Sequence, residues 1–175
     1  MTENTTLTGE RADLLASLAK ARHFLRFTTR GVTEEQARQR TTVSELTLGG
    51  LVKHVTAVER NWQDFIVHGP SIAPDFTSMT EEDYANWANG FRLLDDETLA
   101  GTLAEYEAVA KRTDDLVASL PDLDASHPLP PAPWNPPGER WSARRTLLHI
   151  ATETAQHAGH ADISRESLDG QKSMG

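Results

Sequence analysis

The chain has 175 residues, of which 38% are hydrophobic and 25% are charged, a composition typical of a folded soluble protein and not of a disordered one. Its formal net charge of −9 argues against a nucleic-acid binder, because neutralising phosphates requires a basic surface. The absence of cysteine excludes disulfides, protein thiolate nucleophiles and cysteine metal ligands, so any bound metal must be held by nitrogen and oxygen.

The start of the chain does not have the form of a targeting signal. The first residues contain neither a basic region nor an apolar run, and no stretch elsewhere approaches the length of a membrane span. We therefore expect a cytoplasmic protein that does not bind membranes. Its length suits a single domain with a substantial core, which we place at residues 9–170 between tails at 1–8 and 171–175.

Apolar periodicity predicts two long helices in the first half of the chain. The first spans residues 10–29, and the second spans residues 48–67 after Thr47, a residue suited to N-capping. Between them, the sequence from Thr33 to Gln36 has the form of a capping box, which predicts the start of a short helix. The first half is thus expected to fold as two long helices joined by a short one.

A long irregular crossover is expected at residues 70–95, because it contains prolines and a glycine around one short helix at 81–87. Its aromatic side chains, Tyr84, Trp87 and Phe91, are predicted to cover the end of the core. Lining a ligand pocket is the less favoured alternative for these three residues.

Two more long helices are predicted in the second half of the chain. The first spans residues 96–120, and the second spans residues 141–170, with Ser142 as its N-cap. The proline-rich segment 121–140 between them is expected to form a loop. Four long amphipathic segments with one long crossover predict an all-α four-helix bundle, in which binding sites form between facing helices.

A polar stripe on the last helix is the main candidate site. His149, Glu153, His157 and His160 follow one another at intervals of four, four and three, which places them on one helical face. His54 projects from the core side of the second long helix; taken alone, such a histidine is more often a hydrogen-bonded core residue than a ligand. The Glu-x-x-x-His spacing is likewise common in solvated pairs.

Together these residues favour a metal site over the solvated alternative. His54, Glu153 and His157 would supply two nitrogens and one oxygen to a divalent ion and leave positions for water or substrate. This donor set favours Zn²⁺, although Fe²⁺, Ni²⁺ and Mn²⁺ use it as well.

Two segments resemble the DinB superfamily, in particular its mini-circle-protein-like branch. They are the stretch from Leu51 to Arg60, around His54, and the stretch from Glu153 to Asp162, with His157. The resemblance implies a four-helix bundle of the DinB/YfiT-like type with a divalent metal held by the second and fourth long helices. Many members have His-x-x-x-His on the last helix, whereas the Glu-x-x-x-His found here is similar to the mycothiol-dependent maleylpyruvate isomerases.

The resemblance also implies a function. Relatives use low-molecular-weight thiols such as mycothiol or bacillithiol, so we expect a thiol cosubstrate and transfer of that thiol to a small electrophile. His160 would be a catalytic base or a fourth ligand, and Arg140, Arg144 and Arg145 could bind a carboxylate of the cosubstrate.

Other functions remain open at this point. The chain could be a non-catalytic, stress-related metal-binding protein, or a helical scaffold without metal. The expected partners are small molecules, with nucleic acid excluded and a homodimer as a candidate assembly.

Overall fold

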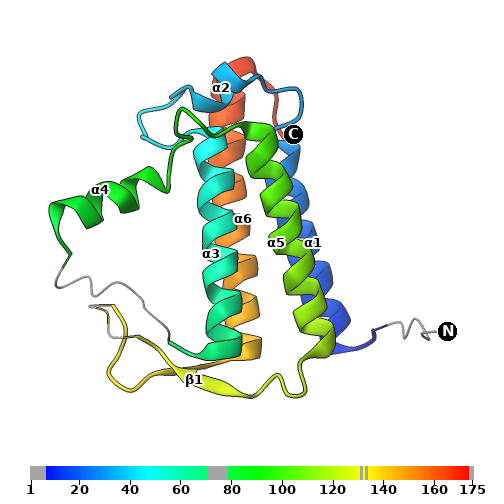
Figure 1. Ribbon diagram of the computed structural model, residues 1–175. Coiled ribbons are helices and arrows are strands. Elements are labelled where there is room, and N and C mark those ends of the chain that lie inside the picture. Colours follow the sequence, from blue (N-terminus) through cyan, green and yellow to red (C-terminus); the bar gives the residue numbers. More distant parts are fainter. Residues whose placement is uncertain (1–6, 71–78, 131, 133, 174–175) are drawn as a thin grey trace.

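The computed structural model describes residues 7–70, 79–130, 132 and 134–173. Within them the chain forms six helices and one two-stranded antiparallel sheet (Figure 1). Most of the expected tail at 1–8 and part of the expected crossover, residues 71–78, lie outside the described residues. In chain order the elements are α1 (Glu10–Phe27), α2 (Glu34–Arg38), α3 (Leu48–His68), α4 (Glu81–Asn89), α5 (Leu99–Ser119), β1 (Ser126–Pro128), β2 (Arg140–Ser142) and α6 (Ala143–Asp169).

The four long helices form the bundle that the sequence predicts. In Figure 1, α1 and α6 run in one direction, while α3 and α5 run in the other. Hydrogen bonds agree with this arrangement. Arg11, at the start of α1, donates to the carbonyl of Leu120 just after α5, and Arg165, near the end of α6, donates to the carbonyl of Thr28 just after α1. The helices α3 and α6 are therefore antiparallel neighbours, which decides where the site forms.

Local capping sets the helix starts. The side chains of Thr47 and Ser142 accept hydrogen bonds from the third residues of α3 and α6, as predicted. Thr33 and Gln36 form the expected capping box of α2. The helix expected from residue 96 begins at Leu99 instead, because the side chain of Thr98 caps α5.

The core combines apolar packing with one buried polar network. Leu18, Leu147 and Ile150 are fully buried in one apolar cluster, and Leu51 and Val55 lie in a second. Between the helices, the buried Glu59 of α3 accepts hydrogen bonds from Arg22 of α1 and Thr113 of α5. Polar groups can be buried in this way because each charge has a partner.

The loop expected at 121–140 contains an element that the sequence analysis missed. Ser126–Pro128 pairs with Arg140–Ser142 as an antiparallel hairpin, in which His127 lies opposite Trp141. Prolines are tolerated at the edge of so short a sheet, and they obscure its pattern in the sequence.

The expectation that Tyr84 and Trp87 cover the core is wrong. Both side chains are more than half exposed, at 54% and 55%, and α4 contains no buried residue. The helix stands away from the bundle in Figure 1, so its aromatic side chains do not reach the apolar interior. Among the helices of the described residues, none has both the length and the apolar character that crossing a membrane requires.

Candidate metal centre

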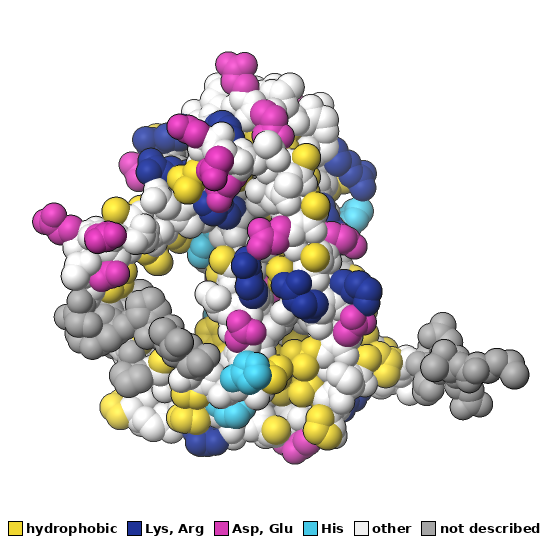
Figure 2. All heavy atoms as spheres, viewed as in Figure 1, with side chains coloured by type: hydrophobic (Ala, Val, Ile, Leu, Met, Phe, Trp, Pro, Cys, Tyr) yellow, Lys and Arg dark blue, Asp and Glu magenta, His cyan; other side chains and the backbone are white. Residues whose placement is uncertain are grey.

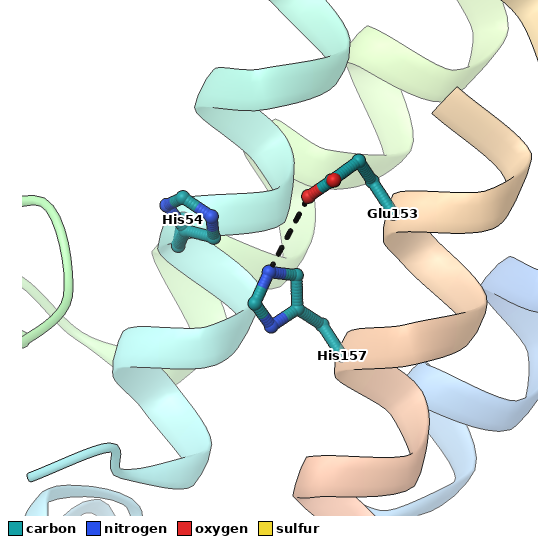
Figure 3. Close-up of side chains that lie close together, drawn as sticks. All are labelled: His54, Glu153 and His157. Atoms are coloured by element: carbon teal, nitrogen blue, oxygen red, sulfur yellow. Dashed lines mark ion pairs between the residues drawn. The ribbon is translucent and has the colours of Figure 1, made fainter. Parts of the chain in front are cut away.

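Two neighbouring helices bring the three predicted metal ligands together. Glu153 and His157 lie one turn apart on α6, and His54 faces them from α3 (Figure 3). One potential donor atom from each residue lies within 4.8 Å of the other two. The antiparallel packing of α3 against α6 produces this cluster, since His54 lies about a hundred positions before Glu153 and His157 in the sequence.

Glu153 contacts a histidine on each side along α6. Its Oε2 lies 3.5 Å from Nε2 of His157, and its Oε1 lies 4.0 Å from Nε2 of His149. The hydrogen bond from His157 lowers the pKa of Glu153, and the surrounding imidazoles add to that effect against the opposing influence of burial. The carboxylate is therefore ionised at neutral pH, as a metal ligand must be.

His54 is held between aromatic rings. The ring of Phe91 stacks on it with centroids 4.2 Å apart, and the ring of His157 meets it edge-on at 4.8 Å. Burial, followed by the proximity of His157, lowers the pKa of His54 to about 4. The imidazole is neutral at physiological pH and offers a nitrogen lone pair to a cation. Two imidazoles and one ionised carboxylate form a donor set that fits a divalent ion.

His160 lies beside the cluster and is not among its three donors. Its Nδ1 is 3.4 Å from Nδ1 of His157, whereas Nε2 of His157 faces Glu153. The ring is exposed to solvent. The geometry suits His160 to two tasks. It can orient the His157 ring through the nitrogen that faces away from Glu153, as outer partners of metal-bound histidines do. It can also exchange protons with solvent.

An aromatic cluster supports the other end of the polar stripe. Trp62 of α3 and Trp141 of β2 stack with their centroids 5.0 Å apart, and the ring of His149 meets both edge-on at 4.9 Å. These contacts hold His149 beside Glu153. The pairing of the two rings across α3 and the hairpin has no local sequence signal.

The three arginines occupy different surroundings. Arg140 donates to the backbone and hydroxyl of Ser126 within the hairpin. Arg144 forms ion pairs with Glu10 and Asp124, so two carboxylates already engage its guanidinium. The guanidinium of Arg145 lies over the ring of Trp141 at 4.3 Å, next to the aromatic cluster. Of the three, Arg145 is thus best placed to meet a ligand at the stripe.

The fold and the family-model match below are those of the DinB/YfiT-like helical proteins, which confirms the resemblance stated from the sequence. A family model described as mycothiol S-transferase matches residues 13–170, and the chain belongs to this family. No curated protein matches the sequence.

Two solved structures illustrate the fold. The colibactin self-resistance protein ClbS, crystallised in complex with double-stranded DNA, is similar with a TM-score of 0.61 and 14% identity, covering 90% of this chain and 96% of its own. A protein from Streptococcus pneumoniae is similar with a TM-score of 0.58 and 14% identity, covering 93% of this chain and 90% of its own. At this identity the likeness shows the fold alone.

The expectation that nucleic acid is excluded as a partner is contradicted by the first of these structures, in which a protein of this fold is bound to DNA. The inference rested on the net charge of −9. A net charge sums the whole surface and does not describe any one face, so it cannot exclude a partner that contacts only part of the molecule.

Proposed function

We propose that the protein transfers a low-molecular-weight thiol, of the mycothiol or bacillithiol type, to an electrophilic small molecule at a divalent metal held by His54, Glu153 and His157. The observation that carries the proposal is the convergence of these three donors within 4.8 Å in a chain of the mycothiol S-transferase family. The chain has no cysteine, so the reacting thiol must come from a cosubstrate.

The chemistry follows from the donor set. A divalent cation, most suitably Zn²⁺, lowers the pKa of a thiol that binds to it. The residues of the chain supply the other requirements. The α3 and α6 side chains fix the reacting position, and His160, exposed one turn beyond His157, accepts the proton that the thiol loses.

The positions of the arginines refine the proposal for thiol binding. We assign a carboxylate of the cosubstrate to Arg145, whose guanidinium lies at the aromatic cluster beside the metal ligands. The guanidinium groups of Arg140 and Arg144 are engaged by Ser126 and by two carboxylates respectively, so they would serve the site by fixing the hairpin and the start of α6.

Thiol conjugation measures this function directly. Metal-loaded protein is incubated with monochlorobimane and, in turn, mycothiol, bacillithiol, glutathione and cysteine. In the reaction a sulfur–carbon bond forms, the carbon–chlorine bond breaks, chloride leaves, and the thiol proton passes to His160. At least one thiol should react faster than in the absence of protein, and this acceleration should vanish in His54→Ala.

The matched control for this experiment is His68→Ala, which removes an exposed histidine from the end of the same helix. It should retain both metal and turnover. If the metal site is full and no thiol binds or reacts, the non-catalytic metal-binding function replaces the transferase function. If wild-type protein retains no ion after Zn²⁺ loading and dialysis, both metal-dependent functions are wrong.

A further inference from the structure

The helix α4 exposes aromatic side chains that the bundle does not use. Tyr84 and Trp87 are 54% and 55% exposed, although both are large and amphipathic. Adjoining exposed apolar side chains on a folded protein commonly mark a place where a ligand or partner binds. The opposite side of this short helix carries polar groups such as Glu82, Asn86 and Asn89, so the aromatic face is distinct.

The aromatic face of α4 is continuous with the metal ligands. Tyr84 and Trp87 are three positions apart and share a helical face, and Phe91 follows just beyond the helix. The rings of Trp87 and Phe91 meet edge-on at 4.8 Å, and Phe91 stacks on His54 at 4.2 Å. The exposed face of α4 thus leads through Phe91 directly to His54.

The junction between α4 and the bundle is closely packed. Gly50 of α3 lies so close to the carbonyl of Phe91 that an added Cβ would collide with it. Arg38 donates hydrogen bonds to the carbonyls of Leu93 and Leu94, at 2.8 and 3.0 Å. At its other end α4 begins with a capping box formed by Thr80 and Asp83. The position of Phe91 on His54 is therefore built into the fold.

The space-filling view shows a hollow between α4 and the bundle (Figure 2). Hydrophobic side chains and a histidine lie along the coloured part of its rim. The reactive carbon of an electrophile must approach the metal ligands, so the rest of the electrophile has to occupy space next to His54. Phe91 covers one face of the His54 ring and connects it to Trp87 of α4.

We propose that Tyr84, Trp87 and Phe91 form the binding wall for the electrophile and select substrates with a planar apolar group. Indole and phenol rings stack on planar groups with little loss of side-chain entropy. The first turn of α4 carries Glu81, Glu82 and Asp83, which disfavours an anionic substrate. The assignment of the bound molecule as an electrophile rests on the proposed transferase function.

Kinetics with two electrophiles test this wall. Monochlorobimane offers a planar bicyclic group, whereas iodoacetamide is small and polar; each loses a halide to the thiol. Trp87→Ala should raise KM for monochlorobimane by roughly tenfold, because about one aromatic contact is lost. The variant should leave KM for iodoacetamide and kcat for both electrophiles unchanged. Trp87→Phe should restore most of the binding. Ile163→Ala, which truncates an exposed side chain on α6, should behave as wild type.

Equilibrium binding separates the failure of this inference from the failure of the transferase function. A bimane methyl thioether, which cannot react, is titrated into wild type and Trp87→Ala, and the ligand fluorescence is followed. Weaker binding to the variant supports the wall even if no thiol is transferred. Equal binding to the two proteins, or an equal rise in KM for both electrophiles, overturns it. A change in oligomeric state on gel filtration without a change in bimane binding also overturns it, since α4 would then dock a protein.

Discussion

At the scale of single residues, the candidate site depends on how each imidazole is held. His54 is stacked on Phe91, His149 meets the stacked rings of Trp62 and Trp141 edge-on, and His157 contacts both Glu153 and His160. Each ring therefore has a neighbour that limits its rotation. Donors that are already in position lose less conformational freedom when a metal binds, which favours binding.

The lowered pKa of His54 predicts a pH dependence of stability in the metal-free protein. Burial, followed by the proximity of His157, lowers this pKa to about 4 from an ordinary value of 6.5. Between these two values the unfolded chain binds a proton at this position and the folded chain does not. The contribution of neutral His54 is therefore complete above about pH 6.5 and declines as the pH falls toward 4.

Urea unfolding at a series of pH values measures this decline. His54→Phe keeps an aromatic ring against Phe91 but removes the titrating group, so its stability should fall less steeply over the same window. Glu153 and His157 face the site in both proteins, so the difference between the two slopes reports His54. Parallel slopes would contradict the prediction.

His160 gives a second prediction at this scale. Because its Nδ1 faces Nδ1 of His157 and not the donor cluster, and glutamine can still hydrogen-bond, His160→Gln should weaken metal binding by about tenfold, the low end of the loss expected for an outer partner of a metal-bound histidine. If the imidazole accepts the thiol proton, the same variant should lower kcat by roughly 10²- to 10⁴-fold. Metal competition titration and thiol-transfer kinetics provide the two measurements. His157→Ala is the reference for losing a ligand, and an equal loss of metal in both variants would make His160 a ligand.

At the scale of elements, the first turn of α3 connects the helix framework to the site. Gly49 and Gly50 are buried within this turn, a position where glycine normally costs helix stability. Their lack of side chains lets Leu93 and the Phe91 backbone approach the helix. The two glycines are therefore used for close packing, and this packing sets the ring of Phe91 on His54.

Gly50→Ala should displace Phe91, because the new Cβ would collide with the Phe91 carbonyl, a backbone group that cannot rotate away. We expect a loss of about 1–3 kcal/mol in stability together with weaker metal binding. Gly159→Ala is the matched control: it lies on the exposed side of α6, and nothing would meet its Cβ within 4 Å. That change should stabilise the helix by up to about 1 kcal/mol. Thermal unfolding measures the stability of both variants, and metal titration measures their affinity for the ion. Equal stability and equal metal affinity of the two variants would contradict the packing role of Gly50.

At the scale of the whole molecule, the helices are joined by the buried ion pair as well as by apolar contacts. Arg22 of α1 binds Glu59 of α3 and also Asp114 of α5, at 2.7 Å to the latter. Thr113, which also belongs to α5, donates a hydrogen bond to the carboxylate of Glu59. Three of the four long helices therefore meet at one polar network, and the register between them is sensitive to each of its members.

Removing one partner tests the strength of this network. Glu59→Ala leaves the guanidinium of Arg22 buried without its main carboxylate and should cost about 3–5 kcal/mol of unfolding free energy. Asp115→Ala breaks the exposed pair with Lys111 on α5 and should cost no more than about 0.5 kcal/mol. Urea denaturation of the two variants gives the comparison. Equal costs would show that the buried network contributes no more than a surface pair.

Most of the helix boundaries could be predicted from the sequence because they depend on local interactions. The capping residues Thr47 and Ser142 act on amides three positions away, and apolar periodicity reflects the pitch of a single helix. The same reasoning placed Glu153 and His157 on one face of α6. By contrast, the hairpin that contains Trp141 depends on pairing between strands that the proline-rich loop separates, so its pattern escaped the prediction.

The sequence alone determined the helical class of the protein, the starts of its long helices and the pairing of Glu153 with His157 on one turn. Only the tertiary structure decided that His54 meets this pair, that Arg144 is engaged by Glu10 and Asp124, and that Trp87 is exposed beside the site. The physical reason is the range of the interactions. Periodicity and capping act within one or two helical turns, whereas the neighbours of a side chain across the bundle depend on the direction and register in which whole helices pack.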